Sequence, residues 1–91
     1  MGNTGESETL LKFPTRFPVK IMGARSEDFA QTIAAVVQRH APDFDPATLE
    51  MRPSKNGTYL ALTATINAQS KQQLDDLYRE LSSHPMVKVA L

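Results

Sequence analysis

The sequence predicts an α+β domain in which two helices cover one face of a four-stranded antiparallel sheet. Three observations lead to this fold class. Between about Phe17 and Leu91, segments with strand and helix periodicity follow one another in the order β-α-β-β-α-β. Asn56-Gly57, a preferred hairpin pair, joins two of the alternating segments. Pro53 interrupts the second strand and so places it at a sheet edge. Together these features predict the ferredoxin-like sandwich, whose strand order is 4-1-3-2.

Composition limits the size and the chemistry of the molecule. The chain has 91 residues, enough for one domain with a single core, which we assign to residues 13–91. Residues 1–12 are rich in Gly, Ser, Thr and Glu and are expected to form a flexible tail. Because there is no Cys, disulfides, thiolate zinc sites and Cys nucleophiles are excluded. No segment resembles a membrane span or a signal peptide, so we expect a cytoplasmic protein without membrane contact.

The first strand and the first helix have clear boundaries in the sequence. Residues 17–22 alternate apolar and polar side chains, and Gly23 ends this strand. Ser26 has the position of a helix N-cap, followed by two acidic residues that would complement the helix dipole. Apolar residues then recur at helical spacing as far as His40, and Pro42 stops the helix.

The hairpin predicts its own register. Asn-Gly favours a type I′ turn, in which both central residues have positive φ. With that turn at Asn56-Gly57, Met51 faces Leu62 and Leu49 faces Ala64, which brings apolar side chains together on one buried face.

The second helix has a starting signal and an apolar stripe. Ser70 and Gln73 have the spacing of a capping box, and Asp75 with Arg79 is a favourable i,i+4 pair. The buried stripe consists of Leu74, Leu77, Tyr78 and Leu81. In the final strand, Val87, Val89 and Leu91 are expected to face the helices.

The sheet face away from the helices is the first candidate binding surface. Alternation assigns to it Lys20, Met22, Glu50, Arg52, Tyr59, Ala61, Thr63, Thr65, Met86, Lys88 and Ala90. Strands one and four are neighbours in this topology, so Lys20 and Lys88 are expected to lie close, where an anion or an acidic partner would relieve their repulsion. The partner-binding candidates are Lys20, Met22, Thr63, Met86 and Lys88. The partner is another protein or a second copy in a homodimer, which could also bind at an edge strand.

The turn between the first strand and the first helix is the second candidate. A glycine permits close backbone approach, and the free amides of a helix N-terminus attract anions. Gly23, Arg25 and Ser26 are therefore candidates for binding a small anionic metabolite.

The sequence contains no pattern that indicates catalysis. His40 and His84 are the only histidines, and no Asp or Glu cluster accompanies them at metal-ligand spacing. No glycine-rich phosphate loop is present, and the serines at 26 and 70 are better explained as N-caps. We therefore expect no enzyme activity, no cofactor and no metal. Nucleic acid is a disfavoured partner, because Lys plus Arg equals Asp plus Glu and only Tyr59 could stack on bases.

Several short segments resemble the YbeD-like family of small bacterial proteins. The resemblance covers Phe13 to Leu91 and lies in residues 13–17, 20–23, 37–42, 54–59, 66–68 and 77–81. It implies a ferredoxin-like fold similar to ACT regulatory domains, which sense small ligands or control a partner enzyme. In ACT domains the ligand site commonly uses the loop after strand one, here Gly23 to Ser26. Family members are often encoded near lipoate-attachment genes, which implies a link to lipoate metabolism.

The function predicted from these features is a non-enzymatic regulatory or adaptor domain that acts through protein contacts. The alternative is a sensor of a small carboxylate, of the ACT type, and the third hypothesis is an RNA-binding module.

Overall fold

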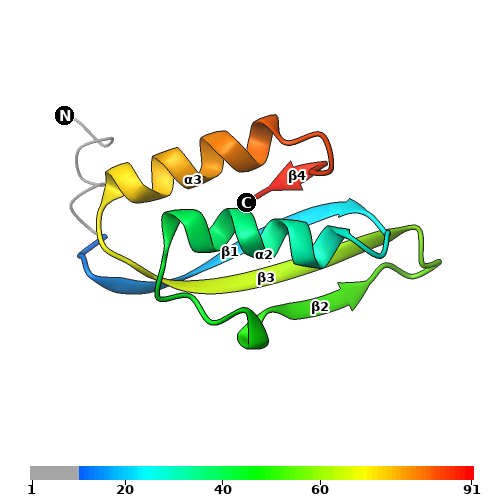
Figure 1. Cartoon of the computed structure of the whole chain (residues 1–91), viewed down its shortest axis with the longest axis horizontal. Coiled ribbons are helices and arrows are strands. Elements are labelled where there is room, and N and C mark those ends of the chain that lie inside the picture. Colours follow the sequence, from blue (N-terminus) through cyan, green and yellow to red (C-terminus); the bar gives the residue numbers. More distant parts are fainter. Residues whose placement is uncertain (1–10) are drawn as a thin grey trace.

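The computed structural model describes residues 11–91 and confirms the predicted element order (Figure 1). The elements are β1 Thr15–Ala24, α2 Phe29–His40, the 3-10 turn η1 Pro46–Thr48, β2 Glu50–Pro53, β3 Tyr59–Ala68, α3 Lys71–Ser83 and β4 Val89–Ala90. The strands form one antiparallel sheet in the order β2-β3-β1-β4, which is the predicted order read from the other edge. The predicted tail, residues 1–12, lies outside the described residues except for its last two.

The core lies between the sheet and the two helices. The central strands β1 and β3 pair along ten residues each, and alternate residues on them are buried. Helices α2 and α3 lie side by side over this face (Figure 1). Fully buried side chains come from both layers: Val19, Ile21, Phe29, Ile33, Val37, Leu62, Ile66, Leu77 and Leu81. Burial of this apolar surface is the main source of stability of the fold.

The hairpin has the predicted register, but its turn is of a different type from the one predicted. Met51 is the register partner of Leu62, as the sequence predicted. However, Gly57 alone has positive φ (79°), so the prediction of a type I′ turn is wrong. Asn56 keeps a negative φ because its side chain stabilises the loop: its Oδ1 accepts from the Thr58 amide at 3.3 Å. The loop spans Ser54 to Tyr59, where the Ser54 amide donates to the Tyr59 carbonyl at 2.9 Å.

Strand β2 is an edge strand, as Pro53 predicted, and its apolar side chains are less covered than expected. Met51 is 59% exposed although it points to the helix side of the sheet. The prediction of a buried position is wrong because Met51 borders an open groove between β2 and α2 instead of packing beneath the helix.

The two helices begin differently. Helix α2 starts at Phe29 after Asp28, so the prediction of Ser26 as its N-cap is wrong. The turn from Ser26 to Phe29 is closed instead by a weak main-chain bond of 3.4 Å. Helix α3 has the predicted cap, since the Ser70 hydroxyl accepts from the Gln73 amide at 3.1 Å.

The ion pairs along α3 differ from the predicted pair. Asp75 binds Lys71 at 2.9 Å, and Arg79 binds Asp76 at 3.1 Å, so the predicted Asp75–Arg79 pair is not formed. Both observed partners lie on the same helix within reach of their carboxylates, at i,i+4 and i,i+3.

Strand β4 is shorter than predicted and presents other residues to the helices. Val89 is the partner of Met22, yet the amide of Lys88 also donates to the Met22 carbonyl, at 2.7 Å. Two consecutive residues thus oppose one, which is the arrangement of a β-bulge. Ala90 pairs with buried Ile21 and packs against the core, so Ala90 faces the helices and Val89 faces away. The predicted alternation, with Val89 inside and Ala90 outside, is wrong because the bulge shifts the register by one residue.

Candidate functional site

The open face of the sheet, away from the helices, carries a row of polar and charged residues. Lys20 pairs with Thr63, and Thr63 pairs with Glu50 on the next strand. Met22, Ala61 and Arg52 form the neighbouring row. Lys20, Glu50, Arg52 and Thr63 share a shallow depression on this face. The partner-binding candidates Lys20, Met22 and Thr63 are therefore adjacent, as predicted.

Beside this row lies an exposed apolar patch that the sequence reasoning missed in part. Met22 is 40% exposed, Val89 42% and Leu91 72%. Met22 pairs with Val89, and Leu91 exchanges two main-chain hydrogen bonds with Lys20, at 2.7 and 3.0 Å. The three apolar side chains are thus neighbours across β1 and the end of the chain. Val89 and Leu91 were assigned to the core because a bulge before a short strand leaves no mark in the apolar alternation.

Lys88 does not lie beside Lys20. Its ammonium nitrogen stands over the ring of Tyr59, 5.5 Å from the centroid, and Tyr59 pairs with Ala24. Ala24 is four residues beyond Lys20 along β1, a distance of about 13 Å at the usual rise of a strand. The predicted contact of two ammonium groups is wrong because Lys88 reaches in the opposite direction, where the phenol ring attracts its charge.

The predicted ligand-binding residues do not converge on a single site, although Arg25 and Ser26 line one hollow beside Pro53 and Leu60. Gly23 is buried, and the space above its α-carbon is filled by the Met86 carbonyl and the Phe29 ring. Arg25 lies along the β2–β3 loop, where its amide donates to the Thr58 carbonyl at 3.0 Å. Ser26 lines a pocket together with Met86 and Lys88, which had been assigned to the partner-binding face.

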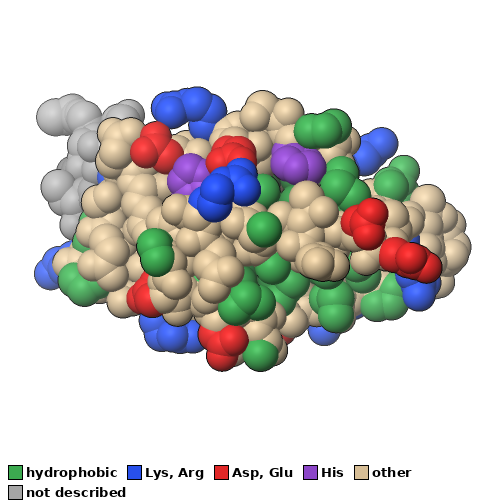
Figure 2. All heavy atoms as spheres, in the orientation of Figure 1, with side chains coloured by type: hydrophobic (Ala, Val, Ile, Leu, Met, Phe, Trp, Pro, Cys, Tyr) green, Lys and Arg blue, Asp and Glu red, His purple; other side chains and the backbone are tan. Residues whose placement is uncertain are grey.

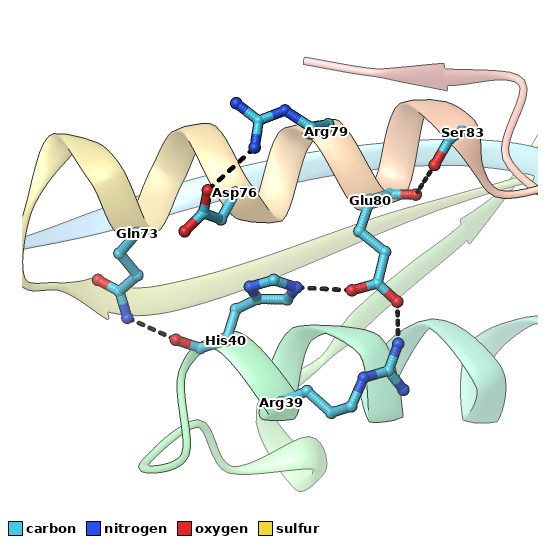
Figure 3. Close-up of polar contacts among 7 residues, drawn as sticks. All are labelled: Arg39, His40, Gln73, Asp76, Arg79, Glu80 and Ser83. Carbon is cyan, nitrogen blue, oxygen red and sulfur yellow. Dashed lines mark hydrogen bonds and ion pairs between the residues drawn. The ribbon is translucent and has the colours of Figure 1, made fainter.

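On the helix side, one carboxylate joins the C-terminal end of α2 to α3 (Figure 3). Glu80 accepts from Arg39 and from His40, whose Nε2 lies 2.6 Å from Glu80 Oε1. Gln73 donates to the main-chain carbonyl of His40 at 2.8 Å and so satisfies one of the free carbonyls at the helix end. The His40 side chain therefore reaches from the end of α2 across to the neighbouring helix.

An apolar groove separates α2 from β2. Figure 2 shows apolar side chains gathered over this region of the helix side. The groove is lined by Ala30, Gln31, Ala34, Ala35, Gln38, Pro46, Ala47, Leu49 and Met51. Several of these side chains are alanines, so the groove follows from small residues on the outer face of α2, opposite an uncovered edge strand.

Residues 11–91 contain neither a cluster of metal-ligating side chains nor a membrane-spanning helix. No three His, Asp or Glu side chains of this part of the chain gather closely enough to hold a metal ion. No helix of the described residues is long and apolar enough to cross a membrane.

Comparison with known proteins identifies relatives along the whole chain. A family model described as a protein of unknown function, DUF493, matches residues 8–91. A UPF0250 protein of Bordetella pertussis is 52% identical over 91 residues, 100% of both chains. A UPF0250 protein of Ralstonia nicotianae is 50% identical over 97% of this chain and 91% of its own length. One of Nitrosomonas europaea is 51% identical over 92% of this chain and 97% of its own. The chain therefore belongs to the DUF493 (UPF0250) family of small bacterial proteins, as the YbeD-like resemblance predicted.

Proposed function

We propose that this chain is a non-enzymatic adaptor or regulatory domain that binds a protein partner on the open face of its sheet. The partner presents an acidic surface with an apolar centre. The observation that carries this proposal is the exposed patch of Met22, Val89 and Leu91 beside cations that pair with no carboxylate of residues 11–91.

The charges of the open face support an acidic partner. Lys20, Arg52 and Lys88 are exposed, and none forms an ion pair with a carboxylate of residues 11–91. Glu50 is the single acidic side chain in the rows around them. A partner that brings carboxylates to this face would gain complementary charge, which raises the association rate and selects against basic partners.

The apolar patch supports a protein rather than a purely electrostatic ligand. A central group of apolar side chains within a polar rim is the usual arrangement of a protein interface, and methionine adapts readily to a partner surface. The link of YbeD-like proteins to lipoate metabolism makes proteins of that metabolism the first partners to test.

The test uses the full chain as bait in lysate of the native organism, followed by binding measurements with the purified partner. Met22→Asp and Lys20→Glu alter the centre and the rim of the face, and Arg79→Glu reverses an equally exposed charge on the helix side. We expect each open-face change to weaken binding by at least about tenfold, or 1.4 kcal/mol, and the Arg79 control to leave it unchanged.

Two results would count against the proposal. A partner that binds all three variants equally uses another surface. A captured ligand that is nucleic acid, released by moderate salt, would favour the RNA-binding hypothesis instead.

A further inference from the structure

The sheet is incomplete at one corner, and a pocket opens there. Strand β1 pairs with β3 as far as Ala24, but its pairing with β4 ends at Met22. Beside the last two residues of β1, a turn at Pro85 and Met86 takes the place of a strand. The pocket at this corner has a volume of about 540 Å³, within the usual range for small-molecule sites.

The wall of this corner pocket is built into the fold. The Met86 amide donates to His84 Nδ1 at 3.1 Å, and the Val87 amide donates to the His84 carbonyl at 3.0 Å. The turn also lies directly on Gly23, where a Cβ atom would stand 2.2 Å from the Met86 carbonyl oxygen. Gly23 is therefore required for the close approach of the turn, and the pocket exists before any ligand binds.

The lining combines apolar surface with one cation. Ala24, Pro85, Met86 and Val87 supply the apolar part, and Ser26, Thr58, Tyr59 and Lys88 supply hydroxyl groups and an ammonium group. No carboxylate lines the pocket, and Lys88 pairs with none among residues 11–91. The Tyr59 ring, 5.5 Å from the Lys88 nitrogen, holds the ammonium group at the pocket.

We propose that the corner pocket binds a small monocarboxylate that carries an apolar chain. The carboxylate pairs with the Lys88 ammonium group and accepts a hydrogen bond from the hydroxyl of Ser26 or Thr58. The apolar chain packs on Met86 and Val87. One cation balances one negative charge, so a dianion such as phosphate would keep a charge without compensation. The site goes beyond the adaptor function, since it needs no protein partner.

The test is a titration of the ¹⁵N-labelled full chain with hexanoate, followed by amide shifts. We expect saturable shifts confined to Ala24, Ser26, Thr58, Tyr59 and residues 86–88. Lys88→Gln should weaken hexanoate binding at least about tenfold, because it removes a charge-assisted bond. Lys20→Gln, an exposed lysine of the same face outside the pocket, is the matched control and should bind as the unaltered chain does.

Three further probes separate the contribution of the single negative charge from that of the apolar chain. Hexanamide lacks the charge, acetate lacks the chain, and inorganic phosphate carries the charge of a dianion, so all three should bind more weakly than hexanoate. A second variant, Met86→Ser, should weaken hexanoate more than acetate. The proposal is overturned if Lys88→Gln binds hexanoate as tightly as the unaltered chain, if phosphate binds better, or if the shifts do not saturate. A failure here leaves the docking of a protein on Lys20 and Met22 intact.

Discussion

The charged side chains of the two helices form ion pairs, whereas those on the open face of the sheet form none with the described residues. Every charged side chain of α2 and α3 is in an ion pair, and Glu80 alone holds two partners. On the open face, Lys20, Glu50 and Arg52 lie in neighbouring rows, and no ion pair joins them. Charges that are satisfied within the molecule stabilise its own helices, whereas charges that face only water remain available for a partner. The difference agrees with the proposal that a partner binds the open face, while the helix side maintains the fold.

The largest effect expected from this comparison is the difference between two adjacent residues of β3. Leu62 is fully buried under the helices, and its neighbour Thr63 lies half-exposed on the open face. Leu62→Ala should lower the free energy of unfolding by about 2–5 kcal/mol, because it leaves a cavity in the core. Thr63→Ala should change it by less than about 0.5 kcal/mol. Urea unfolding followed by circular dichroism measures both.

The same pair of variants also tests whether the open face contributes to binding and not to folding. Thr63→Ala should fold like the unaltered chain and still bind the partner less tightly, since Thr63 lies between Lys20 and Glu50. If both substitutions destabilise the protein equally, the two faces of β3 do not differ as described.

A smaller effect is expected from the carboxylate that joins the two helices. Glu80→Gln removes the charge that Arg39 and His40 share, and should lower stability by about 1–1.5 kcal/mol. The matched control is Asp76→Asn on the same helix, whose partner Arg79 is 73% exposed. That change should cost less than about 0.5 kcal/mol and lose its effect in high salt.

Thermal unfolding at low and high salt distinguishes the two variants. If Glu80→Gln and Asp76→Asn lower the stability equally, the contact of Glu80 between the two helices is worth no more than an exposed ion pair within one helix.

The fold was predictable because its central elements repeat one signal along many residues. Ten-residue alternation on β1 and β3 defines both faces of the sheet, and the Met51–Leu62 register follows from the apolar pattern of the hairpin. Strand β4 was not predictable in the same way. It has two residues, and one bulge at Lys88 reverses which side chains face the core. In a strand this short, the alternation of apolar and polar residues is too brief to predict which side chains face the core, and the packing of neighbouring elements decides it.

The candidate surfaces were predictable only where they depended on the central strands. Lys20, Met22 and Thr63 were placed correctly because β1 and β3 fix them. The corner pocket depends on contacts between residues far apart in the sequence, such as Tyr59 with Lys88 and Gly23 with Met86. The contact of Arg39 with Glu80 is of the same kind. Such contacts arise from the packing of one element on another, and no spacing within a single element indicates them.

The smallest expected effect concerns Tyr78, which connects the helix layer to the end of the chain beside the open face. Its hydroxyl donates to a main-chain oxygen of Leu91 at 2.7 Å, and its ring meets Phe17 edge to face at 6.4 Å. Burial raises the pKa of Tyr78 above its ordinary value of 10.0, because the charged phenolate loses water. The folded state therefore holds this proton more tightly than the unfolded state. Stability from this group is fully present below pH 10 and is lost as the pH rises through the folded-state pKa.

Tyr78→Phe removes the phenol and should make stability less sensitive to pH above about 10, while costing less than about 1 kcal/mol at neutral pH. Tyr59→Phe removes the other phenol of the chain and serves as the matched control, which should keep the alkaline loss. Urea unfolding at a series of pH values from neutral to alkaline measures this slope. An identical alkaline loss of stability in the unaltered chain and in Tyr78→Phe would assign that loss to other groups, and the burial of Tyr78 would then not be its cause. A flatter profile in Tyr78→Phe alone would show that the folded state disfavours the phenolate of Tyr78, as expected where α3 packs beside the chain end.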